Sequence, residues 1–280
     1  MIKKEYFINF SGLYDGLPEC DKERVCVDLT SLYGTNCYCS EDASRAVRMA
    51  LEAIPAEALH WIDTGDYHYA SLFFLEKIRT TYTLFLFDHH PDDQDSAFGT
   101  DILSCGNWVA RARQLPNQSA DFLIERFPPF VQPASGQQIN IFDCSETACL
   151  KARTVDGLDL AGLHSRNIGS SCATFQQAVI ADKQEKSVCG REKGDRPKAY
   201  LSIDKDVLDK QFARTNWDHG SMTLVEMKEL IENIAVSYDI IGADVCGAIT
   251  ESKGASGKDL KINAETDAEL RDLLLNLMTI

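Results

Sequence analysis

The chain has few basic residues for its acidic content. It holds 28 lysine and arginine residues against 43 aspartate and glutamate residues, which gives a formal net charge of -15. A surface with this excess of negative charge repels the phosphate backbone of nucleic acids and favours solubility. We therefore expect no nucleic-acid partner.

Long hydrophobic runs are also missing. Nowhere do about 18 uncharged apolar residues follow one another, the length that a membrane-spanning helix needs. The segment 1–20 contains Lys3, Lys4 and Glu5 and lacks the continuous apolar core of a signal peptide. These absences predict a cytoplasmic protein with no membrane partner.

No linker rich in proline, glycine and serine divides the 280 residues, of which 44% are hydrophobic. Such a chain can bury a substantial core, and one α/β domain of this size is as plausible as two smaller ones.

The ten cysteines are scattered, and many lie inside apolar runs, as Cys26 and Cys246 do. This distribution predicts reduced thiols rather than a disulfide framework. Cys37 and Cys39 form a CxC pair, but no second pair at zinc-finger spacing accompanies them. We expect these two residues to pack and to form a turn.

Short β-rich runs alternate with helical patterns, which is typical of a parallel sheet with crossover helices. The predicted strands are residues 25–28, 59–63, 82–87, 139–142, 199–203 and 240–245. The predicted helices are residues 41–54, after an N-cap at Ser40, and residues 70–78, 107–115, 224–236 and 268–278. The pattern predicts an α/β fold.

Two of the predicted strands run into acidic and histidine residues spaced two apart. Residues 87–93 read FDHHPDD and residues 201–209 read LSIDKDVLD. Residues i and i+2 of an extended chain point to the same side, so the alternate polar side chains of each segment would converge. These side chains are Asp88, His90 and Asp92 in the first segment and Asp204 and Asp206 in the second. Pro91 disfavours helical geometry at His90 and helps to keep the first segment extended.

A third segment, TGDYHYAS at residues 64–71, follows a predicted strand and contains His68, which could otherwise be a capping or core residue. In open α/β sheets, ligands bind at the carboxyl ends of the strands, where all three segments lie. Two imidazoles and four carboxylates without a thiolate suit Mn²⁺ better than structural zinc. Two divalent ions would keep the four carboxylates ionised and could activate a shared water molecule. The sequence therefore predicts a dinuclear centre.

With these segments in this order, the sequence resembles the arginase or ureohydrolase family, whose signatures are a histidine after a glycine-rich strand end, DxHxD and SxDxDxxDP. The resemblance runs from residue 59 to residue 245. It implies a single three-layer α/β domain, residues 1–280, with a central mostly parallel sheet flanked by helices. The ligands carried over by position are His68 and Asp92 on one manganese, His90 and Asp206 on the other, and Asp88 and Asp204 bridging both.

The resemblance also implies an activity. Family members hydrolyse a linear C–N bond other than a peptide bond, often as homo-oligomers. We therefore expect two Mn²⁺ ions with a bridging hydroxide and a guanidine, amidine or related substrate, either a small molecule or a peptidyl group.

Departures from the family pattern leave the substrate and the proton donor open. An extra residue precedes His68, and Val109 stands where arginases keep a proton-shuttling histidine. Gly247 stands where arginases and agmatinases keep the glutamate that grips guanidinium, and Lys210 replaces a proline. Because a bidentate charged contact is lost, free arginine is not the expected substrate. Glu251 could replace the glutamate or simply be solvated.

Further residues are candidates for catalysis and substrate binding. His219 could supply the missing acid or base, and His164 is a lesser candidate for that role. Asp244 matches the family carboxylate that lies behind the metal ligands. The substrate-binding candidates are Asn107, which could instead cap a helix, and Asp143 and Glu146, which could instead be exposed.

Together these features predict a dinuclear manganese hydrolase of the ureohydrolase type. Two alternatives stay open. One is a mononuclear zinc deacylase of the same superfamily, and the other is a metal-binding protein without turnover, which Val109 and Gly247 motivate.

Overall fold

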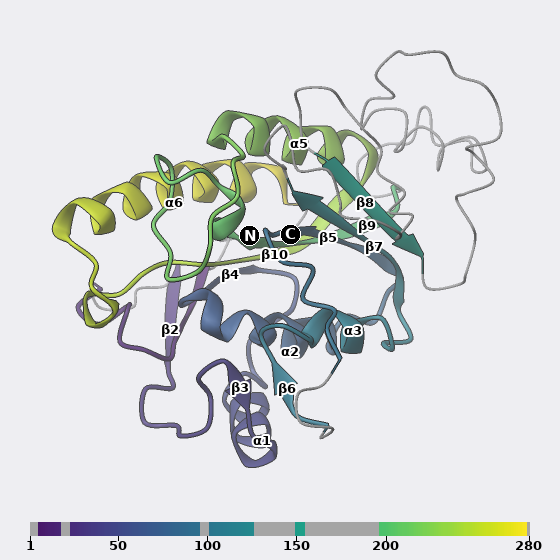
Figure 1. Ribbon diagram of the computed structural model, residues 1–280. Helices are drawn as coiled ribbons and strands as arrows, with labels where there is room; N and C mark the ends of the chain where they lie inside the picture. Colours follow the sequence, from purple (N-terminus) through teal and green to yellow (C-terminus); the bar gives the residue numbers. More distant parts are fainter. Residues whose placement is uncertain (1–4, 18–22, 96–100, 126–148, 155–195, 279–280) are drawn as a thin grey trace, which may run out of the picture.

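A computed structural model of the chain describes residues 5–17, 23–95, 101–125, 149–154 and 196–278 (Figure 1). Its main strands are β1 (Glu5–Asn9), β2 (Arg24–Asp28), β4 (Leu59–Ile62), β5 (Tyr82–Phe87), β7 (Gln118–Glu125), β8 (Cys149–Thr154), β9 (Lys198–Asp204) and β10 (Asp239–Cys246). They form one eight-stranded sheet in the order β2-β1-β4-β10-β9-β5-β7-β8. All neighbours are parallel except β7 and β8. The predicted α/β fold with a mostly parallel sheet is confirmed.

Helices and short strands surround this sheet. The helical elements are α1 (Glu41–Ala50), η1 (Gly65–Ala70), α2 (Ser71–Leu75), α3 (Trp108–Ala112), η4 (Lys205–Val207), α5 (Leu224–Ser237), η5 (Glu251–Lys253) and α6 (Gly257–Leu277). Two short strands, β3 (Tyr38–Cys39) and β6 (Leu103–Ser104), pair separately and antiparallel.

Several element bounds differ from the sequence prediction. Helix α6 begins at Gly257 rather than at residue 268, because a capping box fixes its start. Ser256 accepts a hydrogen bond from the Asp259 backbone, and the Asp259 carboxylate accepts one from the Ser256 backbone. Strands β1, β7 and β8 were not predicted, and predicted strand 139–142 lies outside the described residues.

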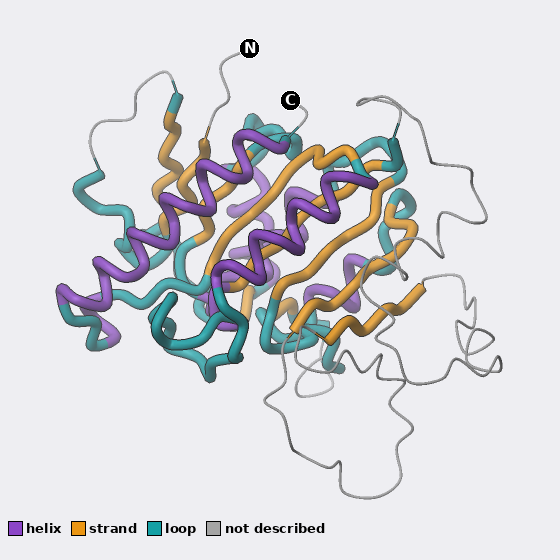
Figure 2. Tube along the Cα trace, turned by 90° about the horizontal axis from the view of Figure 1, so that it is seen from above, coloured by secondary structure: helices purple, strands orange, loops and turns teal. Residues whose placement is uncertain are grey.

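Two layers of helices enclose the sheet. Helices α5 and α6 cover one face, and α1, α2 and α3 lie on the opposite side (Figure 1). Seen from above, α5 and α6 lie side by side over the sheet and run roughly along the direction of its strands (Figure 2). The structure therefore has the three layers that the family resemblance implies.

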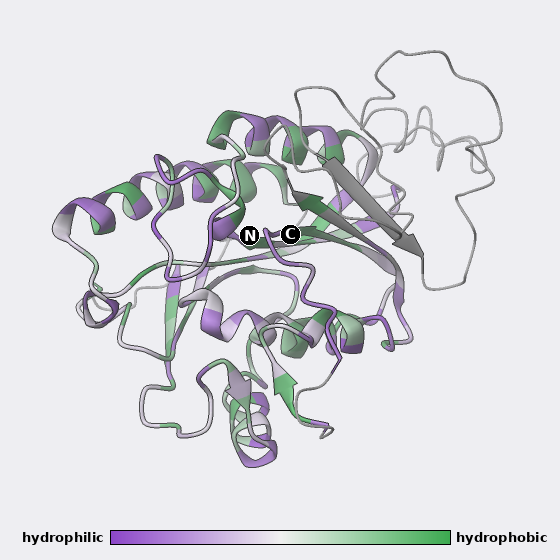
Figure 3. Ribbon diagram, viewed as in Figure 1, coloured by the Kyte–Doolittle hydropathy of each residue, from purple (hydrophilic) through white to green (hydrophobic). Residues whose placement is uncertain are grey.

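The central strands β4, β5 and β10 are buried on both faces, as strands of parallel sheets are. All six residues of β5 are buried: Leu84 and Leu86 join the core beneath α1 and α2, whereas Phe85 and Phe87 join the core beneath α5 and α6. The hydrophobic colouring of the strands and the mixed colouring of the outer helices follow from this arrangement (Figure 3). Side chains of alternate residues thus enter different layers.

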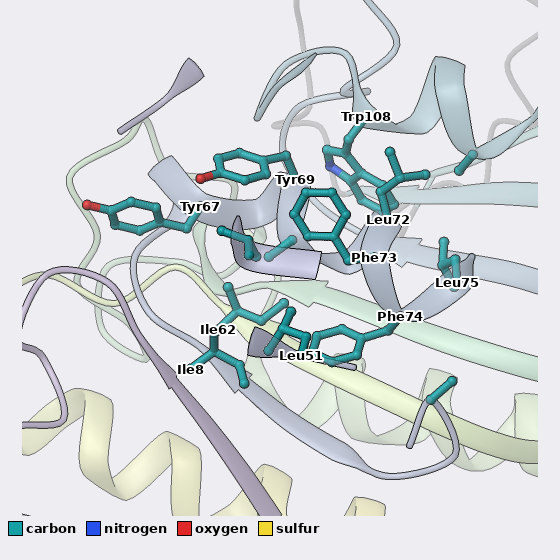
Figure 4. Packing of buried hydrophobic residues seen from close by; sticks show 14 of the residues in the cluster. Ile8, Leu51, Ile62, Tyr67, Tyr69, Leu72, Phe73, Phe74, Leu75 and Trp108 are labelled. Atoms are coloured by element: carbon teal, nitrogen blue, oxygen red, sulfur yellow. The ribbon is translucent and has the colours of Figure 1, made fainter. Parts of the chain in front are cut away.

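The core beneath α2 is rich in aromatic side chains that hold η1 in place (Figure 4). Tyr67 stacks on Phe10 with ring centroids 4.4 Å apart, and the Tyr69 hydroxyl donates to the Thr35 carbonyl at 2.6 Å. His68 lies between these two anchored tyrosines in sequence. Its backbone position is therefore set by the packing of its neighbours.

None of the described helices is both long enough and apolar enough to cross a membrane.

Candidate metal centre

Strand register brings three polar residues side by side at the carboxyl edge of the sheet. Asp204, the last residue of β9, is paired with Cys246, the last residue of β10. On the other side of β9, Ile203 is paired with Phe87, so Asp88 leaves β5 beside Asp204. Because residues i and i+2 share a side, Ser202 and Asp244 form a second pair directly behind Asp204 and Cys246.

The first half of the predicted ligand set gathers around His68. Its Nδ1 lies 3.1 Å from Oδ2 of Asp88, 3.1 Å from Oδ2 of Asp92 and 3.7 Å from Oδ2 of Asp204. The exposed fraction of these side chains is 10% or less. Three acidic oxygens from two segments therefore surround one buried imidazole nitrogen.

The second half gathers around His90. Its Nδ1 lies 2.9 Å from Oδ2 of Asp206 and 3.6 Å from Oδ1 of Asp88. Asp88 thus faces both histidines, one with each carboxylate oxygen. His90 is 32% exposed, so solvent reaches the cluster from its side. The structure brings all six predicted ligands together: His68 lies with Asp88 and Asp92, His90 lies with Asp88 and Asp206, and Asp204 lies with His68 and Cys246.

A relay behind His68 sets the orientation and tautomer of its ring. The Nε2 atom lies 2.9 Å from the Ser202 hydroxyl, which in turn donates to Oδ1 of Asp244 at 2.7 Å. Since that hydroxyl hydrogen is used on Asp244, Ser202 can only accept from Nε2, and the Nε2 atom carries the proton. The Nδ1 atom therefore faces the carboxylates, as a hydrogen bond to the other ring nitrogen arranges for metal-binding histidines.

Two atoms at the centre have no hydrogen-bond partner among the described residues. They are Nδ1 of His68 and Oδ2 of Asp88, both buried. A buried imidazole nitrogen and a buried carboxylate oxygen 3.1 Å apart repel unless a proton or a metal ion lies between them. The donor set therefore fits a divalent cation.

The acid–base properties of the cluster point the same way. Burial and the neighbouring Asp88 raise the pKa of Asp92 to about 7. Burial and the nearby Asp204 raise the pKa of Asp206 well above its ordinary value, whereas Asp206 and Asp88 raise the pKa of His90 to about 11. Without a cation, bound protons neutralise part of the negative charge of these carboxylates. A bound metal ion would displace them.

Turns, and not extended strands, make these residues converge, which corrects the sequence analysis. Asp204 caps η4 by accepting from the Asp206 backbone at 2.9 Å. In the other segment, Asp88 accepts from the His90 backbone at 2.6 Å, and Asp92 has a left-handed φ of 47°. The backbone bonds keep these carboxylates in place, but the prediction that Pro91 keeps the segment extended is wrong.

The structure adds residues that the sequence analysis did not place at the site. Cys246 lies with its Sγ 3.2 Å from Oδ2 of Asp204, and the Trp108 indole donates to Oδ2 of Asp92 at 2.7 Å. Asp66 accepts from the Trp217 indole and from the Asn216 amide, both at 3.0 Å. Cys246 follows Asp244 by two residues and Asp66 precedes His68 by two, so both were within reach of the spacing rule used for the motifs. No such rule joins Trp108, Asn216 or Trp217 to them.

The two departures from the family pattern have physical explanations. A Cβ at Gly247 would lie 2.0 Å from Oδ1 of Asp204, and its φ of +84° is in the left-handed region. A glutamate is therefore sterically excluded here. Val109 is buried in the core beneath α2, so no proton-shuttling side chain extends from that position. Glu251 is exposed.

The remaining candidates either make contacts with the backbone or fall outside the described residues. His219 is half-buried and uses Nδ1 on the Leu208 carbonyl at 3.1 Å; burial lowers its pKa. Asn107 accepts from the Ser104 backbone and donates to the Ile102 carbonyl, so its amide braces a loop. Three candidates fall outside the described residues: Asp143, Glu146 and His164.

Comparison with solved structures identifies the fold. Formimidoylglutamase from Bacillus subtilis superposes with a TM-score of 0.55 and 13% identity, covering 99% of this chain and 88% of that one. Proclavaminate amidino hydrolase from Streptomyces clavuligerus superposes with a TM-score of 0.53 and 14% identity over 98% and 91%. A putative agmatinase from Clostridium difficile superposes with a TM-score of 0.50 and 14% identity, covering 98% of this chain and 97% of that one.

Sequence comparison is less informative. An uncharacterized protein of Thermotoga maritima is 25% identical over 187 residues, which are 67% of this chain. The match covers 56% of the length of that relative. No family model matches the sequence. The structural likeness alone therefore carries the conclusion that the chain has the fold of the arginases, agmatinases and formimidoylglutamases.

Proposed function

We propose that the protein is a dinuclear metal-dependent hydrolase that cleaves a linear C–N bond of a guanidine, amidine or related substrate. One observation carries the proposal: six ligand side chains converge at the carboxyl edge of the sheet, and two of their buried atoms face each other without hydrogen bonds. Buried polar atoms of folded proteins seldom lack a hydrogen-bond partner, and those that do often mark a site for an ion. The fold of known amidine and guanidine hydrolases supports it.

The six residues would divide between two divalent ions. His68 and Asp92 would hold one ion and His90 and Asp206 the other, with Asp88 and Asp204 between them. Oxygen and nitrogen ligands of this kind favour Mn²⁺, and two per chain are expected. Bound there, two divalent ions would supply Lewis-acid activation of a water molecule.

The surrounding residues orient this centre and give access to it. Asp244 and Ser202 hold His68 with its Nδ1 lone pair facing the carboxylates. Substrate would approach beside His90, the most exposed of the six ligands. His219 uses its Nδ1 hydrogen on the Leu208 carbonyl, which makes its Nε2 a proton acceptor at neutral pH. We propose it as a base at the rim.

Asp66 is our candidate for the residue that recognises the substrate cation in place of the missing glutamate. It is 2% exposed, and its Oδ2 has no hydrogen-bond partner among the described residues, although Lys253 Nζ lies 3.6 Å away. The neighbouring Asn216 Oδ1 is also a buried acceptor without a donor. Two such oxygens suit the N–H groups of an amidine or guanidine.

The decisive experiment changes Asp204 and Asp206 to asparagine together. Asparagine keeps the shape of each side chain but removes the negative charge, so we expect loss of both metal binding and turnover. Metal is quantified per chain, and release of urea or ammonia is screened with arginine, agmatine, guanidinobutyrate, formimidoylglutamate and a peptidyl arginine. Retained turnover in the double variant would contradict the proposal.

Asp66→Asn tests the substrate contact separately. We expect a KM raised by about tenfold or more with unchanged metal content, because the change removes a charge-assisted contact from the substrate and leaves all six metal ligands in place. The matched control is Glu251→Gln, which removes a carboxylate from the exposed element η5. A KM that changes equally in both variants would exclude the specific contact.

Metal counting separates the proposal from the zinc deacylase alternative. Ligands gathered around two different imidazoles, those of His68 and His90, favour two ions over one. One zinc per fully active chain would favour the alternative.

A further inference from the structure

Cys246 lies inside the candidate metal centre, and neither the signatures nor the proposed ligand set uses it. Strand register places it opposite Asp204, and its thiol is 1% exposed. Its Sγ lies 3.2 Å from Oδ2 of Asp204, the oxygen that also faces His68. The sulfur therefore belongs to the wall of the cluster that faces the buried imidazole.

A possible ligand group follows from these positions. One atom each of His68, Asp204 and Cys246 lies within 4.8 Å of the other two, and all three residues are buried. His68 Nδ1, which lies 3.7 Å from Oδ2 of Asp204, is one of the two buried central atoms without a hydrogen-bond partner among the described residues. An imidazole nitrogen, a carboxylate oxygen and a sulfur around one point form a mixed donor set that divalent transition metals accept.

Two features of the fold direct the sulfur to this point. Residues Asp244 and Cys246 lie on the same side of β10, so the strand that supplies the relay behind His68 also supplies the thiol in front of it. The next residue, Gly247, has no side chain, and a Cβ there would collide with Asp204. The backbone therefore approaches closely enough for Cys246 to touch the cluster.

We propose that Cys246 is a thiolate ligand of the ion held by His68 and Asp204. The inference rests on the proposed metal centre and changes its chemistry. On binding, the S–H bond breaks, the proton leaves to solvent and a metal–sulfur bond forms, with no change of oxidation state. Thiolate favours Zn²⁺, Co²⁺ or Fe²⁺ over Mn²⁺ at this position, whereas the position of Asp88, His90 and Asp206 keeps oxygen and nitrogen ligands.

Anaerobic titration of the metal-free protein with Co²⁺ tests the assignment. We expect an intense near-ultraviolet sulfur-to-cobalt charge-transfer band in the unchanged protein and its loss in Cys246→Ser and Cys246→Ala. The control is Cys37→Ser, because Cys37 is a partly buried cysteine beside Asp66 outside the ligand groups. This control keeps the band. We also expect Zn²⁺ binding to release one proton fewer in Cys246→Ser.

The outcomes distinguish this inference from the proposed function. If Co²⁺ binds without a charge-transfer band, Cys246 is not a ligand but the metal centre stands. If Co²⁺ does not bind at all, both are overturned. Should the Cys246 variants fail to fold, X-ray absorption of the zinc-loaded unchanged protein decides, because a thiolate ligand places sulfur about 2.3 Å from zinc. Absence of that sulfur shell overturns the inference, and its retention in Cys37→Ser supports it.

Discussion

At the scale of single residues, the candidate metal centre depends on a glycine as well as on its charged ligands. Gly247 allows β10 to end against Asp204, and the same position in arginases and agmatinases carries the glutamate that grips guanidinium. The local backbone has no room for any side chain at this position, so under the proposed function the contact with a substrate cation would come from another element.

Gly247→Ala tests this argument. We expect at least a tenfold loss of metal affinity, because the new Cβ displaces Asp204. The matched control is Gly254→Ala: its φ of +94° carries the same backbone strain, but nothing lies within 4 Å of the added Cβ. Both variants should lose about 1–2 kcal/mol of unfolding free energy from the left-handed backbone. Equal metal affinity in the two would show that the clash does not matter.

A second prediction concerns His60, a buried histidine away from the cluster. Its ring contacts the Tyr200 hydroxyl and the Pro55 carbonyl and stacks on Phe74. Burial lowers its pKa from 6.5 to about 3. The unfolded chain therefore binds a proton at His60 below pH 6.5, whereas the folded chain does not. The free energy of unfolding is highest above pH 6.5 and falls as the pH drops towards 3.

Urea unfolding of the metal-free protein measures this effect. Between pH 7.5 and pH 5.5, His60 should cost about 1.4 kcal/mol of unfolding free energy. His60→Gln removes this term, whereas contributions from the other histidines are common to both proteins and cancel in the difference. An identical pH dependence in the two proteins would mean that His60 is protonated in the fold.

At the scale of elements, the turn after β9 faces two ways. Asp204 and Asp206 face the cluster, whereas Lys205 between them is 2% exposed and its ammonium lies 2.5 Å from Oδ1 of Asp267 on α6. The sequence motif therefore contains a structural residue among the ligands. The contact ties η4, and with it the ligands, to the helix layer on the far face of the sheet.

Removing Asp267 from this ion pair should lower the free energy of unfolding more than removing Lys205. Asp267→Ala leaves a buried ammonium without its carboxylate, and we expect a loss of about 3 kcal/mol. Lys205→Met leaves only a carboxylate that is 32% exposed, so its cost should be below about 1 kcal/mol. The double variant should be as stable as Lys205→Met alone. These differences are measured by urea unfolding, and an additive double variant would exclude the pairing.

At the scale of the whole molecule, acidic charge is concentrated where metal would bind. The chain carries a net charge of -15, and four of its carboxylates meet in one cluster. Mutual repulsion in that cluster opposes folding in the absence of a cation. Residence in the cytoplasm and homo-oligomer formation remain predictions from the sequence.

Divalent ions should therefore stabilise the whole fold. At an Mn²⁺ concentration 100 times the dissociation constant, linkage predicts about 2.7 kcal/mol of added stability, or a rise in Tm of roughly 5–10 °C. Thermal unfolding is followed as the chelated protein is titrated, and Tm should keep rising with the logarithm of the free Mn²⁺ concentration once the sites are filled. The Asp204→Asn and Asp206→Asn double variant serves as the control. An equal rise in that variant would place the stabilising ions elsewhere.

The sequence by itself determined which residues stand at the ends of the strands, because the periodicity of hydrophobic residues marks β4, β5, β9 and β10 and the acidic motifs follow directly. It also determined the α/β class and the six candidate ligands. Only the tertiary structure decided that β10 lies beside β9. Strand order depends on how two hydrophobic cores pack, which local sequence does not encode. The contacts of Cys246 and Asp66 and the steric exclusion at Gly247 therefore follow from the meeting of distant segments.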